Sequence, residues 1–288
     1  MSTAGPSRTV ANAAATLLCL SSLGAQAAAQ RPGQGEIPWE EGPVVGSLGK
    51  EARVNVGDGC AFAGVEGTKQ FLTLTQNPTN GDERGTVLCT VLRSATDTGG
   101  WFAVFEYDAS GYVKDDEKST LDADAILASL REGMEAGNKV RRQRGWTALQ
   151  LVGWERAPFY DPQTNNLTWA TRLRDEDGSE TINHSVRLLG RAGVMSVDLV
   201  VDPLDYQASL GPFSRLVAAH EYSGGFRYAE WREGDKVASY GLTALVAGGA
   251  GALAVKSGLL GKLWKVIVAA GVAAAAGIKK LFSKRAHA

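Results

Sequence analysis

Hydrophobic residues alternate with other residues through most of the stretch 71–201, and this alternation is the strongest constraint that the sequence places on the fold. Trp101, Phe105 and Tyr107, for example, share one face of an extended segment. A period of two is typical of strands that bury one face, and it favours an antiparallel sheet. The predicted strands are residues 86–92, 101–107, 147–154, 167–174, 181–190 and 193–201, and the predicted hairpin turns are residues 174–178 and 190–193.

Helical periodicity occurs in two stretches. Residues 122–138 place apolar side chains at helical spacing, carry acids in the first turn and follow Ser119 and Thr120 as candidate caps. The second predicted helix covers residues 203–222, with a kink expected at Pro212. The order of strands and helices predicts an α+β fold, a two-layer sandwich in which two helices pack on an antiparallel sheet. In topology alone, that order resembles the small two-layer sandwiches of the Mog1 and PsbP type.

The first 29 residues have the plan of a secretory signal peptide. Arg8 is their only charge, and it precedes a short apolar run that ends in small residues. The run is shorter than a bilayer crossing needs, and an uncleaved anchor or a disordered leader is the alternative. Cleavage is expected after Ala27 or Ala29. Residues 30–50 are then a Gly- and Pro-rich linker, and residues 51–238 form the exported α+β domain.

Residues 239–288 are predicted to anchor the chain in a membrane. The runs 241–255 and 266–278 lack charges, but each alone is too short to cross a bilayer comfortably. The expected solution is a single crossing, by residues 240–261 or by residues 260–278, and a membrane hairpin is the alternative.

Aromatic, basic and small residues refine the prediction for this tail. If residues 260–278 cross, Trp264 lies at the interface, and Lys279 and Lys280 lie in the cytoplasm as the positive-inside rule requires. The exported domain is then periplasmic, and the protein belongs to the bacterial inner membrane. Small residues early in the tail allow close helix packing and hence self-association, with a glycine-rich hinge as the alternative. These small residues include Gly248, Gly249 and Gly251.

Charge is strongly segregated along the chain. The net charge of −1 is the sum of +1 from Arg8, −9 from residues 31–236 and +7 from residues 241–288. Residues 31–236 hold 22 basic and 31 acidic residues, and residues 241–288 hold seven basic residues and no acidic one. An acidic body does not offer the clustered lysines and arginines that nucleic acids require. The sequence therefore argues against nucleic acid as a partner and favours the lipid bilayer.

Two cysteines, Cys60 and Cys89, remain after the expected cleavage of the signal peptide. In an oxidising compartment they can form a disulfide, which the loop-entropy model values at about 3–4 kcal/mol. The alternative is a pair of buried thiols that behave as small apolar residues. The sequence leaves both alternatives open.

No catalytic motif is evident in the sequence, which lacks a nucleophile elbow, a phosphate-binding loop, a dinucleotide fingerprint and zinc-ligand spacing. His184 is expected on a core-facing strand position, and His220 at the end of the second helix, where its charge would complement the helix dipole. Carboxylates crowd residues 108–124 and suggest Ca²⁺, but a solvated acidic edge is the simpler interpretation. No cofactor and no metal are therefore expected. The acids concerned are Asp108, Asp115, Asp116, Glu117, Asp122 and Asp124.

Five sequence motifs resemble those of a known bacterial family. The motifs are residues 111–117 (GYVKDDE), 154–161 (WERAPFYD), 166–170 (NLTWA), 189–193 (LGRAG) and 234–242 (GDKVASYGL). From about Gly35 to the tail, the chain resembles the membrane-anchored proteins grouped as domain of unknown function 2167. Members often carry tyrosine in place of His184, which argues against catalysis by that histidine. The resemblance implies an exported domain with a membrane tail, and it supplies no reaction and no ligand.

Three functions follow as hypotheses. The lack of a catalytic constellation favours a membrane-anchored envelope protein whose periplasmic domain binds a partner or acts as a scaffold. The first alternative is a carboxylate- or metal-dependent periplasmic enzyme that uses the acids of residues 108–124 and His184. The second alternative is a membrane-perturbing protein that acts through the Gly-rich tail.

Overall fold

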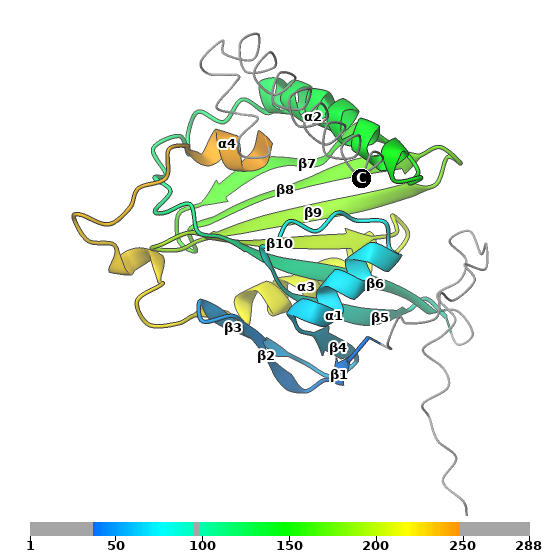
Figure 1. Ribbon diagram of the computed structural model, residues 1–288, viewed down its shortest axis with the longest axis horizontal. Helices are drawn as coiled ribbons and strands as arrows, with labels where there is room; N and C mark the ends of the chain where they lie inside the picture. Colours follow the sequence, from blue (N-terminus) through cyan, green and yellow to red (C-terminus); the bar gives the residue numbers. More distant parts are fainter. Residues whose placement is uncertain (1–36, 95–97, 248–288) are drawn as a thin grey trace, which may run out of the picture.

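The computed structural model describes residues 37–94 and 98–247 of the chain. Its central element is an eight-stranded antiparallel sheet with the strand order β1-β4-β5-β6-β10-β9-β8-β7 (Figure 1). The strands are β1 (Glu40–Glu41), β4 (Cys60–Ala63), β5 (Glu83–Leu92), β6 (Thr98–Asp108), β7 (Leu149–Asp161), β8 (Asn166–Asp175), β9 (Glu180–Leu189) and β10 (Val194–Val201). Strands β7 to β10 form a continuous meander, and β10 then pairs with β6 from much earlier in the chain.

A smaller sheet and one helix cover one face of the large sheet. The smaller sheet has the order β11-β3-β2, and its strands are β11 (His220–Tyr222), β3 (Ala52–Val56) and β2 (Val44–Leu48). The helix is α3 (Tyr206–Ala218). Alternate residues of β6, β9 and β10 that point to this face are mostly apolar, so the larger hydrophobic core lies between these layers. Phe105, Leu199 and Phe213 are among its most buried side chains.

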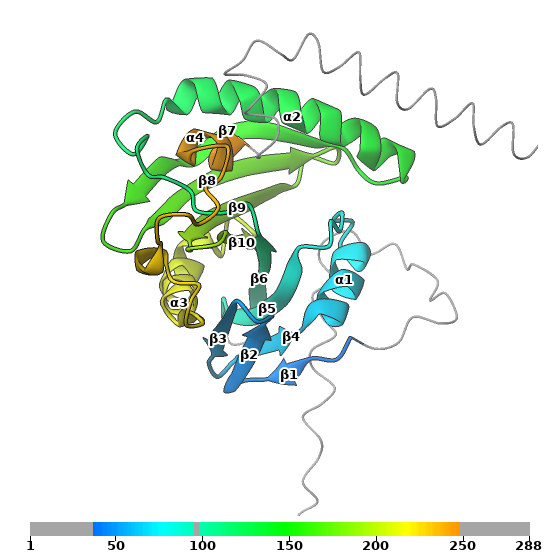
Figure 2. The same ribbon diagram turned by 60° about the vertical axis from the view of Figure 1, so that its left-hand side comes forward.

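Three helices cover the opposite face. They are α1 (Val65–Leu74), which packs on β4 and β5, α2 (Ala123–Gln143), which packs on β7, and α4 (Leu242–Ala247), which packs beside α2. Adjacent residues of β6 distinguish the two faces, because Phe102 contacts Phe71 of α1 whereas Trp101 contacts α3. Figure 2 shows α1 and α2 over opposite ends of the sheet. A second, smaller core lies under α2 and α4.

The fold class predicted from the sequence is confirmed in outline, because the protein is α+β with a mostly antiparallel sheet and a few packed helices. The predicted two-layer arrangement with two helices is wrong, because a smaller sheet and α3 cover one face of the large sheet while α1, α2 and α4 cover the other. The six predicted strands are present, and the predicted turns join β8 to β9 and β9 to β10. The sequence does not predict α1. The second predicted helix is too long, because residues 220–222 leave α3 and pair with β3. The predicted cap of α2 is also wrong, since Asp122 accepts the hydrogen bonds of the Asp124 and Ala125 amides at 3.1 and 3.0 Å.

Two predicted domain boundaries are wrong. The expected linker, residues 30–50, contains β2, and Leu48 at the end of that strand is fully buried in the larger core. Glycines and a proline around β2 conceal its alternation from sequence analysis. The expected anchor begins at residue 239, yet α4 packs within the domain and buries Leu242 completely. The described domain therefore extends from β1 to α4.

The predicted leader and most of the predicted anchor lie outside the described residues. This applies to residues 1–29 and to Gly248, Gly249, Gly251, Trp264, Lys279 and Lys280. Within residues 37–94 and 98–247, no helix combines the length and the hydrophobicity that a membrane crossing requires. The signal peptide, the crossing and the self-association stay predictions.

Candidate functional site

Polar side chains occupy the middle of the large sheet, on the face that carries α1 and α2. We call five of them the sheet-face cluster: Glu106 of β6, Ser196 and Asp198 of β10, and Ser185 and Arg187 of β9. Glu106, Ser196 and Arg187 lie opposite one another across the three strands, and Asp198 lies opposite Ser185. Their neighbours in sequence point to the other face and fill the larger core, so the same strands serve the core and the cluster.

The guanidinium of Arg187 is held by an ion pair and by an aromatic ring. Its Nη1 donates a hydrogen bond to Asp198 Oδ1 at 2.9 Å, and the side chains of Arg187 and Asp198 are 15% and 26% exposed. The guanidinium carbon lies 4.7 Å from the centre of the Trp169 ring, in a cation–π arrangement. The buried Ser185 donates to the same oxygen of Asp198. These contacts fix the positions of Arg187 and Asp198, because charge-assisted hydrogen bonds are stronger in a half-buried site than in water.

Glu106 is the second carboxyl group of the sheet-face cluster. It is partly exposed, and it makes no hydrogen bond through its side chain to any residue that the structure describes. Burial is the main reason why the pKa of its carboxyl rises from 4.5 to about 7. The negative charges of Asp198 and Glu83 act in the same direction, and Arg187 opposes them. Glu106 therefore changes its charge near neutral pH.

The cluster combines a carboxyl group that titrates near neutral pH with a carboxylate held by an arginine. Protonated Glu106 donates a hydrogen bond, and ionised Glu106 only accepts, while the serine hydroxyls do both. Such a set can bind a polar group that lies across the strands. Two carboxyl groups in different surroundings are also typical of acid–base catalysis. Over the described ranges of the chain, no group of three or more His, Cys, Asp or Glu side chains is arranged to hold a metal ion.

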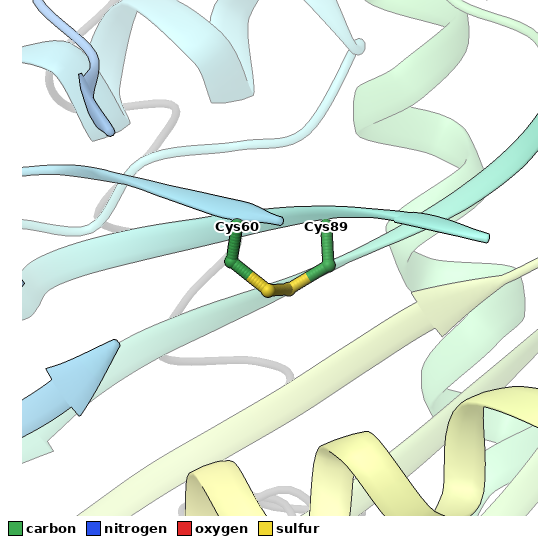
Figure 3. The surroundings of a disulfide bond; sticks show 2 residues. All are labelled: Cys60 and Cys89. Carbon is green, nitrogen blue, oxygen red and sulfur yellow. A yellow bond between two sulfur atoms is a disulfide. The ribbon is translucent and has the colours of Figure 1, made fainter. Parts of the chain in front are cut away.

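Cys60 and Cys89 form a disulfide (Figure 3). The two residues lie directly opposite each other on β4 and β5, with a Cα–Cα distance of 4.1 Å. Of the two alternatives that the sequence leaves open, the structure contains the bridged form. The bridge faces the larger core, on the other side of the sheet from the sheet-face cluster, so its role is structural.

Of the two described histidines, His184 is buried and His220 is half-buried. His184 lies on the core face of β9, with its Nδ1 at 3.1 Å from the Tyr206 hydroxyl. His220 lies on β11, and its buried Nε2 has no hydrogen-bond partner in the described part of the chain. Burial lowers the pKa of each imidazole to about 4. Both side chains are therefore neutral at pH 7, and the expected interaction of a charged His220 with the end of a helix is absent from this structure.

Several of the acids of residues 108–124 make separate structural contacts. Asp108 accepts a hydrogen bond from the Tyr240 hydroxyl. Glu117 accepts one from an amide in the first turn of α4 at 2.9 Å, and Asp122 caps α2. Among the described residues, these acids form no group that is arranged to hold a metal ion.

Glu106, Arg187 and Asp198 are not predicted as site residues from the sequence. Alternation assigns them to the face away from the larger core, and in antiparallel sheets that face is often solvated. A signal is nevertheless present, because Val104 and Val194 share this face and are apolar, which indicates a face that is only partly open. Alternation alone does not reveal that β6 and β10 are neighbours, and this pairing is what brings the charges together.

The chain matches a family profile described as protein of unknown function (DUF2167) over residues 41–279. The chain belongs to this family. The resemblance found in the sequence motifs is therefore confirmed, and the DUF2167 match includes the whole sheet-face cluster. No match was found among curated proteins. Among solved structures, the solution structure of cyanobacterial PsbP (CyanoP) from Synechocystis sp. PCC 6803 matches with 10% identity and a TM-score of 0.36, over 68% of this chain and 99% of that chain.

Proposed function

We propose that this DUF2167 protein is a membrane-anchored protein of the bacterial cell envelope, whose periplasmic domain binds a partner through the sheet-face cluster. The signal-peptide plan of residues 1–29 supports export. The uncharged runs and the basic end of the tail support a single crossing of the inner membrane with a cytoplasmic C-terminus. The Cys60–Cys89 disulfide supports an oxidising compartment, as the periplasm is.

The sheet-face cluster is the observation that carries the proposed binding. Apolar side chains cover a sheet face more stably than ion pairs do, because charges removed from water lose solvation energy. Here Arg187 and Asp198 are mostly removed from water, and burial, with a smaller contribution from nearby carboxylates, raises the pKa of Glu106 to about 7. The cluster therefore presents donors and acceptors to a partner in the middle of the sheet, between the ends that α1 and α2 cover.

Site-specific photo-crosslinking in cells tests the proposed binding site. A photoreactive amino acid replaces Ser196, which lies between Glu106 and Arg187. The control position is Val45, which is 60% exposed on β2 in the smaller sheet. We expect a discrete cross-linked product at Ser196 and none at Val45, and we expect Arg187→Met to abolish it. Equal products at both positions, or no product at Ser196, contradict the proposed site.

A carboxylate-dependent periplasmic enzyme is the second candidate, and the raised pKa of Glu106 favours it. In this candidate protonated Glu106 is the general acid and Asp198 the general base. Neither His184 nor the acids of residues 108–124 take part. Glu106→Gln then abolishes turnover but leaves the free energy of unfolding at pH 5 within about 1 kcal/mol of the wild type. In a binding protein the same variant keeps its cross-linked partner, because glutamine preserves the shape and hydrogen bonds of the neutral acid.

A further inference from the structure

A cavity of about 490 Å³ lies between α2 and α4, and we call it the helix pocket. Residues from the segments 114–122 and 237–241 form its remaining walls. Sites that bind small molecules typically measure about 300–1,000 Å³, so the helix pocket has the size of a ligand site. It is distinct from the sheet-face cluster, none of whose residues lines it.

Small side chains keep the helix pocket open. Ala125 and Ser129 lie one turn apart on α2, and Ala244 and Ala247 line the pocket from α4. Helices that face each other through alanine and serine leave space that larger side chains would fill. The floor is apolar, because Ile126 is 1% exposed and belongs to the smaller core. The interior therefore suits a slender apolar group.

The rim of the helix pocket carries an excess of carboxylates. Lys114 lines it together with Asp116, Glu117 and Asp122, and all but Glu117 are exposed. Glu117 and Asp122 are held in position because they accept hydrogen bonds from amides at the starts of α4 and α2. This rim repels a negatively charged ligand end and accepts an uncharged or positively charged one.

The helix pocket also lies where the described chain ends. Ala247 lines the pocket and is the last described residue, and the uncharged run of residues 241–255 continues beyond it. Under the proposed function this run leads into the membrane anchor, which places the pocket close to the bilayer. Aliphatic chains are the abundant apolar ligands at such a position.

We propose that the helix pocket binds one aliphatic chain of an amphiphile whose polar end is uncharged or cationic. The aliphatic chain lies between Ala125 and Ala244 against Ile126, and the polar end stays at the rim beside Asp116. Each methylene group buried in this way strengthens binding about fourfold. The position near the bilayer rests on the proposed function, whereas the chemistry of the pocket rests on its lining alone.

Photoaffinity labelling of the full chain in phosphatidylcholine nanodiscs tests the helix pocket. Three soluble probes share a dodecyl chain that carries a diazirine, and they differ in a trimethylammonium, maltoside or sulfate head. A phosphatidylcholine with a diazirine in its acyl chain distinguishes a bilayer lipid from a soluble amphiphile as the source. Mass spectrometry of peptides locates the label. We expect saturable labelling of segments 114–129 and 237–247 by the ammonium and maltoside probes, and about tenfold weaker labelling by the sulfate probe.

Two variants of α2 separate binding in the pocket from general adsorption. Ala125 is exposed and lines the pocket, so Ala125→Phe places a ring in the pocket and leaves the core intact. The matched control is Ala128→Phe, because Ala128 is exposed on the same helix but does not line the pocket. We expect Ala125→Phe to reduce labelling about tenfold and Ala128→Phe to leave it unchanged. If Ala125→Phe alters thermal unfolding, Ser129→Phe blocks the same space from the next turn.

Labelling of the pocket peptides by the bilayer lipid or by the soluble probes, with loss in Ala125→Phe, supports the proposal. Equal labelling of Ala125→Phe and Ala128→Phe, a preference for the sulfate probe, or unlabelled pocket peptides overturns it. Membrane fractionation of cells that produce the full chain tests the membrane anchoring separately. A chain in the soluble fraction whose pocket is labelled overturns the anchoring and not the pocket.

Discussion

Replacing Glu106 by glutamine is expected to change stability in a way that depends on pH. The pKa of the Glu106 carboxyl is about 7 in the folded protein, against an ordinary value of 4.5. That difference corresponds to about 3 kcal/mol for keeping the ionised group in the folded state. Partial exposure to solvent reduces the cost, so we expect about 1–2 kcal/mol. Because the folded pKa is raised, the contribution of the protonated group to stability is fully present below about pH 4.5 and is lost as the pH rises through about 7.

Glutamine keeps the shape of the protonated acid and never ionises. Glu106→Gln is therefore expected to exceed the wild type in free energy of unfolding by about 1–2 kcal/mol at pH 9, and by only about a few tenths at pH 5. Urea unfolding of the full chain in detergent micelles, followed by tryptophan fluorescence, measures both values. Glu132→Gln on the exposed face of α2 is the control for loss of a surface charge. No gain at pH 9, or the same gain at both pH values, refutes the burial argument.

Three further predictions concern the core. The Asp205 carboxylate is 2% exposed, and Arg93 binds it at 2.7 and 2.8 Å. Arg93→Met removes this guanidinium, so we expect urea unfolding to show a free energy of unfolding that is about 3–5 kcal/mol lower. A decrease below about 1 kcal/mol would contradict a stabilising role for the pair. Under non-reducing conditions, the free energy of unfolding of the double variant Cys60→Ser/Cys89→Ser should be about 3–4 kcal/mol lower than that of the wild type, and dithiothreitol should not lower it further. A decrease within error of zero rules out the bridge. Burial lowers the pKa of His220 to about 4, so its contribution to stability is present above about pH 6.5 and is lost as the pH falls toward 4. When the pH is lowered from 7 to 4.5, the free energy of unfolding should fall by about 1–2 kcal/mol less in His220→Phe than in the wild type. An equal fall in both proteins would disprove this origin of acid sensitivity.

The sequence predicts those parts of the fold that local patterns determine. Alternation identifies the strands from β7 to β10, because each buries one face against the domain and turns sharply at its ends. Helix α1 has no such local signal. It contains Gly67 and Thr68, which favour helices weakly, and its first residue follows Gly64 without a side-chain cap. Packing stabilises it, since Gly67 lies so close to Ala63 that a side chain there would clash.

Contacts between distant segments explain the remaining differences. Residues 220–222 are compatible with a helix, and they form β11 because β3 offers an unpaired edge from the other end of the chain. The sheet-face cluster depends in the same way on the pairing of β6 with β10. Glu106 and Asp198 are each visible in the sequence as polar positions within a strand. Their closeness, which adds to the effect of burial on the pKa of Glu106, follows only from the sheet order.

A pair of reporter fusions tests most directly the claim that an exported domain is anchored by the tail. An enzyme that is active only in the periplasm is joined after Ala247 in one fusion and after Ala288 in the other. The first fusion point follows α4, because an earlier one would remove the fully buried Leu242 from the domain. We expect activity after Ala247 and silence after Ala288. Silence at both positions contradicts export of the domain, and activity at both contradicts a single crossing by the tail.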